Sequence, residues 1–277
     1  MDYFPLPVVR ALLRAIGVVV LAGGVCAAQV GPPVCPVNPG GQPVGLTPAV
    51  RPTAEQIKAT AEAGAADPTV MVAAEPVANF GTERYRLADY AECVGGGGCY
   101  WADLDAQTRR AEMALERVIA TAKAGEKLAM VLDIDETSMS GFCELRREDY
   151  GFLLASFNKW VVTPEAAVPI PGTLRLCDKA RAAGLEVFFI TGRRDELRDA
   201  TEKNLTLAGY KGWKGLALRN GPQKTMATVE YKSEERKKIV DAGYRIVMSV
   251  GDQWSDLNGT SKAEISVKLP NPFYYLP

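Results

Sequence analysis

Two aspartates separated by one residue, Asp133 and Asp135, follow the apolar run of residues 128–132. Five successive apolar residues are typical of a strand buried on both faces at the centre of a parallel sheet. Open α/β sheets bind their ligands beyond the carboxyl ends of such strands. Side chains at positions i and i+2 of an extended segment share one side. One carboxylate could therefore bind a hard cation while attacking an electrophile such as a phosphoryl group, and the other could transfer protons.

Any strand can end in an acidic turn, so Asp133 and Asp135 alone indicate little. A second apolar run, residues 187–190, leads into Thr191-Gly192-Arg193. A hydroxyl and a guanidinium at a strand end suit the oxygens of a phosphate group, although a threonine there could also be a simple cap.

A third apolar run, residues 246–250, leads into Gly251-Asp252, and Asp256 follows four residues later. If this strand neighbours the central one, its carboxylates lie beside Asp133. Mg²⁺ prefers octahedral oxygen ligands and takes one or two carboxylates in most sites. Asp133 and Asp252, with the Asp135 backbone carbonyl, would supply these ligands, and Asp256 would act through a water molecule or outside the first ligand shell.

A charged run, residues 230–238, precedes the third strand. For residues 234–238 we predict a solvated helix face. Lys232 is different, because it lies at the expected start of the helix. A cation there could keep a nucleophile ionised and neutralise charge on a transferring phosphoryl group.

The composition excludes several classes of chemistry. The chain of 277 residues contains no histidine. Ser-His-Asp and Cys-His catalysis, histidine phosphatases and the usual His-ligated zinc sites are therefore excluded. With 32 basic and 33 acidic residues, the formal net charge of -1 gives no electrostatic footprint for nucleic acid.

The elements that must position these side chains alternate along the chain. Predicted helices cover residues 103–124, 173–183, 196–208 and 233–242, and predicted strands cover residues 128–132, 186–191, 216–218, 244–250 and 265–269. This alternation predicts an α/β fold, a parallel sheet flanked by helices and joined by right-handed crossovers. Residues 138–170 form an insertion after the first strand, and its aromatic residues either wall the site or pack internally.

The N-terminal part predicts export. Residues 1–28 have the basic start, apolar centre and small residues of a signal peptide, and their apolar stretch is shorter than the about 20 residues of a membrane span. Cys26 could carry a lipid anchor, but Gly23-Gly24-Val25 fits a lipoprotein cleavage site poorly. Residues 29–52 predict a flexible linker, and residues 53–65 a helix capped by Thr53. The expected location is periplasmic or secreted, with no stable membrane span.

Cys93 and Cys99 enclose a valine and four glycines. An oxidising compartment would favour a disulfide that closes this loop. The glycines lack the Lys-Ser/Thr ending of a phosphate-binding P-loop. The partners of Cys35, Cys143 and Cys177 stay open.

Four segments resemble, in order, the motifs of haloacid-dehalogenase-like phosphatases. They are Asp133-Ile-Asp135-Glu-Thr137, Ile190-Thr191-Gly192-Arg193, Tyr231-Lys232-Ser233 and Gly251-Asp252-Gln-Trp-Ser-Asp256. From about residue 80 the chain is similar to the class B acid phosphatase branch that includes plant vegetative storage proteins, as is its ending, Lys268-Leu-Pro-Asn-Pro-Phe-Tyr-Tyr-Leu276.

The resemblance implies a Rossmann-like sheet and a phosphoaspartyl mechanism. By position, Asp133 is the nucleophile and Asp135 the general acid and then base. Thr191, Gly192, Arg193 and Lys232 bind the substrate phosphate, and Asp133, Asp135, Asp252 and Asp256 form the Mg²⁺ site.

We therefore expect residues 53–277 to form a phosphatase domain with an N-terminal helical extension and a core at residues 126–270. The expected activity is that of an exported Mg²⁺-dependent acid phosphatase acting on small phosphate monoesters. A phosphotransferase on the same fold and a non-catalytic storage or binding protein are the alternatives; the oligomeric state stays open.

Overall fold

The computed structural model describes residues 30–35, 52–71 and 76–276. The predicted signal peptide with Cys26, and most of the predicted linker, lie outside the described residues. None of the described helices combines the length and the apolar character that crossing a bilayer requires.

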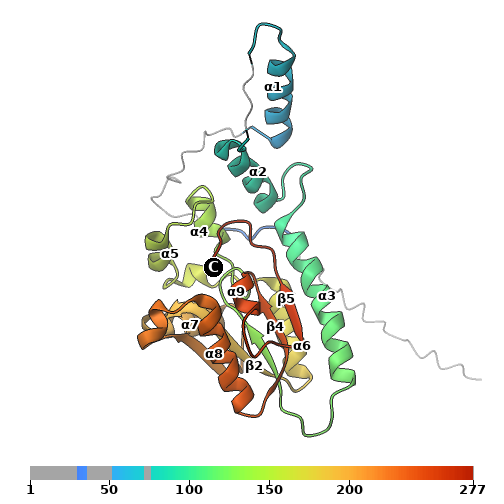
Figure 1. Cartoon of the computed structure of the whole chain (residues 1–277), viewed down its shortest axis with the longest axis vertical. Helices are drawn as coiled ribbons and strands as arrows, with labels where there is room; N and C mark the ends of the chain where they lie inside the picture. Colours follow the sequence, from blue (N-terminus) through green and yellow to red (C-terminus); the bar gives the residue numbers. More distant parts are fainter. Residues whose placement is uncertain (1–29, 36–51, 72–75, 277) are drawn as a thin grey trace, which may run out of the picture.

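Five parallel strands form one sheet in the order β3-β2-β1-β4-β5 (Figure 1). The predicted parallel α/β fold is confirmed, with the first strand at the centre of the sheet. The strand bounds are β1 Leu128–Leu132, β2 Glu186–Arg194, β3 Gly215–Arg219, β4 Arg245–Gly251 and β5 Ile265–Lys268.

Both faces of β1 are buried because helices cover the sheet on each side. Met130 and Leu132 belong to a large core with α3 and α6, whereas Ala129 and Val131 pack in a smaller core with Tyr231 of α8. The helix bounds are α1 Ala54–Ala66, α2 Phe80–Glu92, α3 Tyr100–Ala120, α4 Phe142–Arg147, α5 Leu154–Trp160, α6 Pro171–Ala182, α7 Arg198–Leu207, α8 Thr228–Asp241 and α9 Trp254–Leu257. Figure 1 shows α1 and α2 extending beyond one end of this layered unit.

Local sequence explains the start of α1. The Thr53 hydroxyl and the Gln56 side chain form a reciprocal capping box at α1, as the predicted cap requires. Helix α8 begins at Thr228, five residues before the predicted start, so Lys232 lies within the helix and not at its first residue. The prediction of a solvated face for residues 234–238 was wrong in part: Glu235 and Arg236 are buried.

Two disulfides join the segments around the site. Cys93–Cys99 closes the glycine loop between α2 and α3, which confirms the predicted pair. Cys35–Cys143 links residues 108 positions apart and ties the N-terminal segment to the start of α4. Cys177 is a free, buried thiol.

Helices α3 and α6 approach closely at Gly172, the second residue of α6. A Cβ atom at this position would lie 2.1 Å from the Thr108 hydroxyl oxygen. We expect Gly172→Ala to lower the free energy of unfolding by about 1–3 kcal/mol, because overpacking forces neighbouring groups to move.

Urea denaturation of purified variants measures this effect. Gly64→Ala is the control, since nothing lies within 4 Å of a Cβ at that helix position. Thr108→Ala in the Gly172→Ala background should restore part of the lost stability; a Gly172→Ala protein as stable as the parent would contradict the packing argument.

Candidate active site

A cavity of about 740 Å³ opens at the carboxyl ends of the central strands. Strand order reverses between β1 and β4, the position at which open α/β sheets form their ligand crevice. The insertion after β1 contributes one wall of this cavity. This was one of the two alternatives expected for its aromatic residues, the other being internal packing. The lining residues from the insertion are Phe152, Leu154, Phe157 and Asn158.

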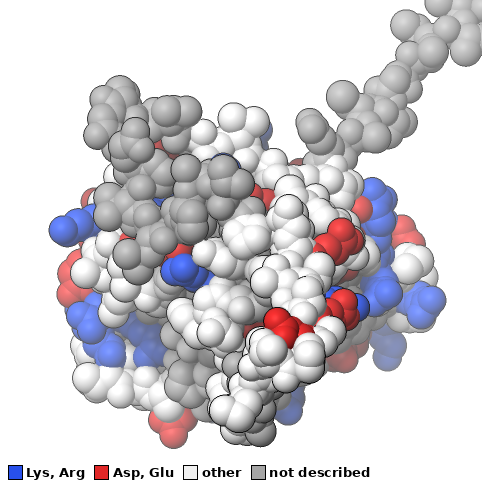
Figure 2. Space-filling model, turned by 90° about the horizontal axis from the view of Figure 1, so that it is seen from above, with Lys and Arg blue, Asp and Glu red and all other residues white. Residues whose placement is uncertain are grey.

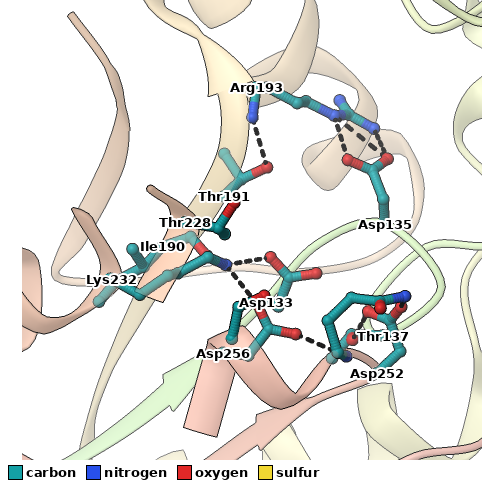
Figure 3. A network of polar contacts seen from close by, with 12 residues as sticks. Asp133, Asp135, Thr137, Ile190, Thr191, Arg193, Thr228, Lys232, Asp252 and Asp256 are labelled. Atoms are coloured by element: carbon teal, nitrogen blue, oxygen red, sulfur yellow. Dashed lines mark hydrogen bonds and ion pairs between the residues drawn. The ribbon is translucent and has the colours of Figure 1, made fainter. Parts of the chain in front are cut away.

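Lys232 connects the first strand end to the fourth. Its ammonium lies 2.5 Å from Asp133 Oδ1 and 2.9 Å from Asp256 Oδ1 (Figure 3). The same ammonium donates to the carbonyl of Ile190, in the middle of β2. One buried cation therefore contacts groups from β1, β2 and the loop after β4.

Asp252 is held by donors from three segments. Thr137 Oγ1 donates to Oδ1 at 2.9 Å, and Gln253 Nε2 and Asn271 Nδ2 each donate to Oδ2 at 2.7 Å. The Asp252 carboxylate is thereby fixed in one orientation without any basic partner in direct contact.

The electrostatics of this cluster favour a divalent cation. Burial raises the pKa of Asp133, the Lys232 ammonium opposes that rise, and Asp256 and Asp252 add to it. Burial, reinforced by Asp256, raises the pKa of Asp252 to about 7. Burial by itself disfavours the Lys232 ammonium, but the carboxylates of Asp133 and Asp256 raise its pKa above the ordinary value. Three buried carboxylates face a single ammonium, an excess of negative charge that a divalent cation would offset.

Asp133, Asp252 and Asp256 offer the oxygen atoms for such an ion. One carboxylate oxygen from each lies within 4.8 Å of the others. Carboxylate oxygens are the donors that hard cations such as Mg²⁺ prefer. These three residues therefore fit a divalent cation. They are three of the four metal ligands that the sequence predicted.

The fourth predicted ligand, Asp135, points its carboxylate away from this cluster. Arg193 contacts both carboxylate oxygens, with Nε 3.0 Å from Oδ2 and Nη2 2.6 Å from Oδ1 (Figure 3). The Arg193 guanidinium also donates to Thr201 Oγ1 at 3.1 Å. The predicted phosphate ligand Arg193 thus orients Asp135 in this structure, and the backbone carbonyl of Asp135 is the group that the cation hypothesis requires.

Thr191 and Gly192 lie beside the cluster, within β2, which continues to Arg194 beyond the predicted strand end at residue 191. The buried Thr191 hydroxyl accepts a hydrogen bond from the Arg193 backbone at 3.2 Å. Gly192 lines the cavity, and a Cβ there would meet nothing within 4 Å. The structure therefore brings the predicted phosphate-binding segment to the same crevice as Asp133.

The C-terminal segment completes the site, which the sequence did not predict. Besides Asn271, Tyr274 donates its hydroxyl to Glu136 Oε2 at 2.6 Å, and Gln253 Oε1 accepts from the Leu276 backbone at 3.0 Å. Glu136 is fully buried with a φ of 53°, and burial raises its pKa to about 7. The sequence marked this C-terminal segment only by its resemblance to the family's ending. The hydrogen bonds of Asn271, Tyr274 and Leu276 could not be inferred from it.

Arg236 is the other side chain that sequence reasoning missed. It is 1% exposed, and its guanidinium donates to backbone carbonyls of Asp256, Asn258, Thr260 and Ser261. These carbonyls belong to α9, which carries Asp256, and to the segment that follows it. Arg236 thereby fixes the path of this segment from inside α8.

An Asp-x-Asp after the central strand, a threonine within β2, a lysine from α8 and an aspartate pair after β4 define the phosphatase class of the haloacid dehalogenase superfamily. A family model described as HAD superfamily, subfamily IIIB (Acid phosphatase) matches residues 51–277, and the chain belongs to this family. The predicted family is confirmed.

Curated relatives agree with this membership. The chain is 38% identical over 149 residues to acid phosphatase 1 of Solanum lycopersicum, covering 53% of this chain and 58% of the relative. It is 37% identical over 156 residues to the stem 28 kDa glycoprotein of Glycine max, covering 54% and 61%. It is 34% identical over 151 residues to vegetative storage protein 1 of Arabidopsis thaliana, covering 53% and 55%. The matches thus span less than two thirds of each relative.

A solved structure shares the fold. The class C acid phosphatase from Bacillus anthracis superposes with a TM-score of 0.52 at 22% identity, covering 63% of this chain and 78% of that one. At this identity the likeness shows the fold alone.

We expect Mg²⁺ to raise the melting temperature, because an ion that binds only the folded state stabilises it. The rise should shrink strongly in Asp252→Asn, which removes one of three clustered carboxylates. Thermal unfolding with Mg²⁺ and with EDTA measures this. Asp178→Asn, at an exposed carboxylate outside the cavity, is the control, and equal shifts in both variants would contradict the site.

Asn271→Ala should weaken cation binding by about 10–100-fold, because groups that orient a ligand contribute to metal affinity. Calorimetric titration with Mg²⁺ gives the dissociation constant. Tyr275→Ala alters an exposed side chain of the same segment and should bind as the parent does. An unchanged constant in Asn271→Ala would show that the amide does not position Asp252.

Proposed function

We propose that this protein is an exported, Mg²⁺-dependent acid phosphatase that hydrolyses phosphate monoesters through an aspartyl-phosphate on Asp133. The observation that carries the proposal is the contact of the buried Lys232 ammonium with Asp133, 2.5 Å away, beside the carboxylates of Asp252 and Asp256. A nucleophilic aspartate must be ionised at the moment of attack, and an adjacent ammonium favours that state.

The first half of the reaction transfers the phosphoryl group. An Asp133 oxygen forms a bond to phosphorus while the bond to the ester oxygen breaks. Thr191, the Gly192 backbone and Lys232 hold the phosphoryl oxygens, which distributes their negative charge among fixed donors. Asp135, oriented by Arg193, gives its proton to the leaving alkoxide so that an alcohol departs.

The second half regenerates the enzyme. Asp135, now ionised, takes a proton from water, and the resulting hydroxide attacks phosphorus and releases Asp133 with inorganic phosphate. When bound by Asp133, Asp252 and Asp256 with the Asp135 carbonyl, Mg²⁺ supplies electrostatic stabilisation of the phosphoryl charge.

The cavity supports a small phosphorylated substrate. Its volume of about 740 Å³ falls within the range of small-molecule sites, about 300–1,000 Å³. Phe152 and Tyr274, with ring centroids 4.5 Å apart, add an apolar surface beside the polar floor. Acidic and basic side chains are interspersed on the face that Figure 2 shows.

The two disulfides support export. Disulfides persist in oxidising compartments and are rare in the cytosol. Cys93–Cys99 and Cys35–Cys143 are therefore in keeping with a periplasmic or secreted location.

Asp133→Asn should abolish turnover of p-nitrophenyl phosphate, because an amide cannot form the acyl phosphate. EDTA should abolish the activity of the parent, and Mg²⁺ should restore it. Release of p-nitrophenol measures both effects. Acid quenching of the parent with labelled substrate should leave phosphate on the protein, and the same treatment of Asp133→Asn should leave none.

Asp199→Asn is the matched control, since this residue lies on α7 and does not line the cavity. Undiminished hydrolysis by Asp133→Asn would reject the assignment of the nucleophile. Capture of the phosphoryl group by added alcohols in preference to water would instead indicate a phosphotransferase.

A further inference from the structure

Two arginines lie side by side at the wall of the cavity formed by β2 and β3. Arg194 and Arg219 are register partners at the ends of these neighbouring parallel strands, and both line the cavity. Burial lowers the pKa of Arg219, and the positive charge of the nearby Arg194 lowers it further.

The other basic side chains that line the cavity have partners of opposite sign. Arg193 pairs with Asp135, and Lys224 pairs with Glu196. Lys232 pairs with the carboxylates of the candidate cation site. Within the part of the chain that the structure describes, no carboxylate forms an ion pair with Arg194 or Arg219. The positive charge of this pair is thus left uncompensated.

Arg219 is held rigidly although it has no carboxylate partner. It is 8% exposed, and its Nη1 donates to the backbone carbonyls of Gln223 and Met226 at 2.9 and 2.7 Å. The guanidinium stacks on the Tyr231 ring, 4.8 Å from its centroid. A buried cation surrounded by neutral groups carries an electrostatic cost that an anionic ligand would reduce.

Helix α8 relates this arginine pair to the proposed phosphate site. Arg219 Nη2 donates to Thr228 Oγ1 at 2.9 Å, and Thr228 precedes Lys232 by one helical turn. Arg194, Arg219 and Lys232 all line the same cavity.

We propose that Arg194 and Arg219 form a second anion subsite, which selects phosphate monoesters that carry another anionic group at their far end. Arg219 supplies a fixed guanidinium, and the exposed Arg194 closes on the ligand. Guanidinium groups bind phosphate and carboxylate oxygens through paired, charge-assisted hydrogen bonds. The inference rests on the proposed phosphatase function and names the substrate class of that same site.

A series of unbranched substrates tests the subsite. Alkyl monophosphates are compared with α,ω-alkanediyl bisphosphates and with ω-phosphoalkanoates over two to six carbons, and phosphate release gives kcat/KM. At the best chain length, a bisphosphate or a phosphoalkanoate should exceed the alkyl monophosphate by at least about tenfold, as a charge-assisted hydrogen bond implies. The two terminal groups distinguish phosphate from carboxylate; no preference for either at any length overturns the proposal.

Arg194→Gln should remove most of this preference, and Arg194→Lys should retain part of it because the charge remains without the paired donors. Arg198→Gln is the matched control: it removes the same charge nearby, but Arg198 pairs with Glu202 and does not line the cavity. An equal loss in Arg198→Gln and Arg194→Gln would indicate general attraction of anions and would overturn the subsite.

Binding separates this proposal from the phosphatase function. Calorimetry with the Asp133→Asn protein measures affinity for the best bisphosphate and its monophosphate without turnover. Tighter binding of the bisphosphate that is lost in Asp133→Asn/Arg194→Gln supports the subsite even if the parent enzyme hydrolyses no ester. Equal affinities overturn it even if p-nitrophenyl phosphate is hydrolysed.

Discussion

The buried contact between Lys232 and the carboxylates of Asp133 and Asp256 is the constraint on which the site depends. Removing such charges from water costs several kcal/mol for each ion, and only close, well-oriented partners recover that cost. The three groups come from α8, from the end of β1 and from the loop after β4. The sheet order places β1 beside β4, and α8 packs across the same strands, so the contact forms only in the complete fold.

The loop after β4 illustrates how backbone contacts support this constraint. Gly251 permits the turn, because a Cβ there would lie 2.3 Å from Asp256 Cβ. Arg236 then donates to the carbonyls of Asp256 and Thr260, in and after α9, from the buried side of α8. Lys232 and Arg236 lie one helical turn apart, so a single helix face supplies both the cation that contacts Asp256 and the cation that holds its loop.

Sequence reasoning succeeded where chemistry and strand ends coincide. Asp133, Thr191 and Asp252 each follow an apolar run, and parallel strands bring their carboxyl ends to one edge of the sheet. It did not find Asn271, because its contact with Asp252 depends on the path of a segment without regular structure. The charge run containing Arg236 showed no apolar periodicity that would mark a buried face. The disulfide partner of Cys35 required the tertiary fold, since Cys143 lies 108 residues away.

Charge is distributed unevenly across the cavity, and this has a consequence for how a ligand would lie in it. On the floor, the carboxylates exceed the single ammonium, and a divalent cation would restore the balance. At the wall formed by β2 and β3, Arg194 and Arg219 leave positive charge without a described ion-pair partner. The insertion contributes aromatic surface, including Phe152. A ligand with one anionic group on the floor and its apolar part against the insertion would still leave the arginine wall uncompensated. With a divalent cation bound at the floor, both ends of the cavity would carry positive charge, which is the basis for the proposed preference for ligands with an anionic group at each end.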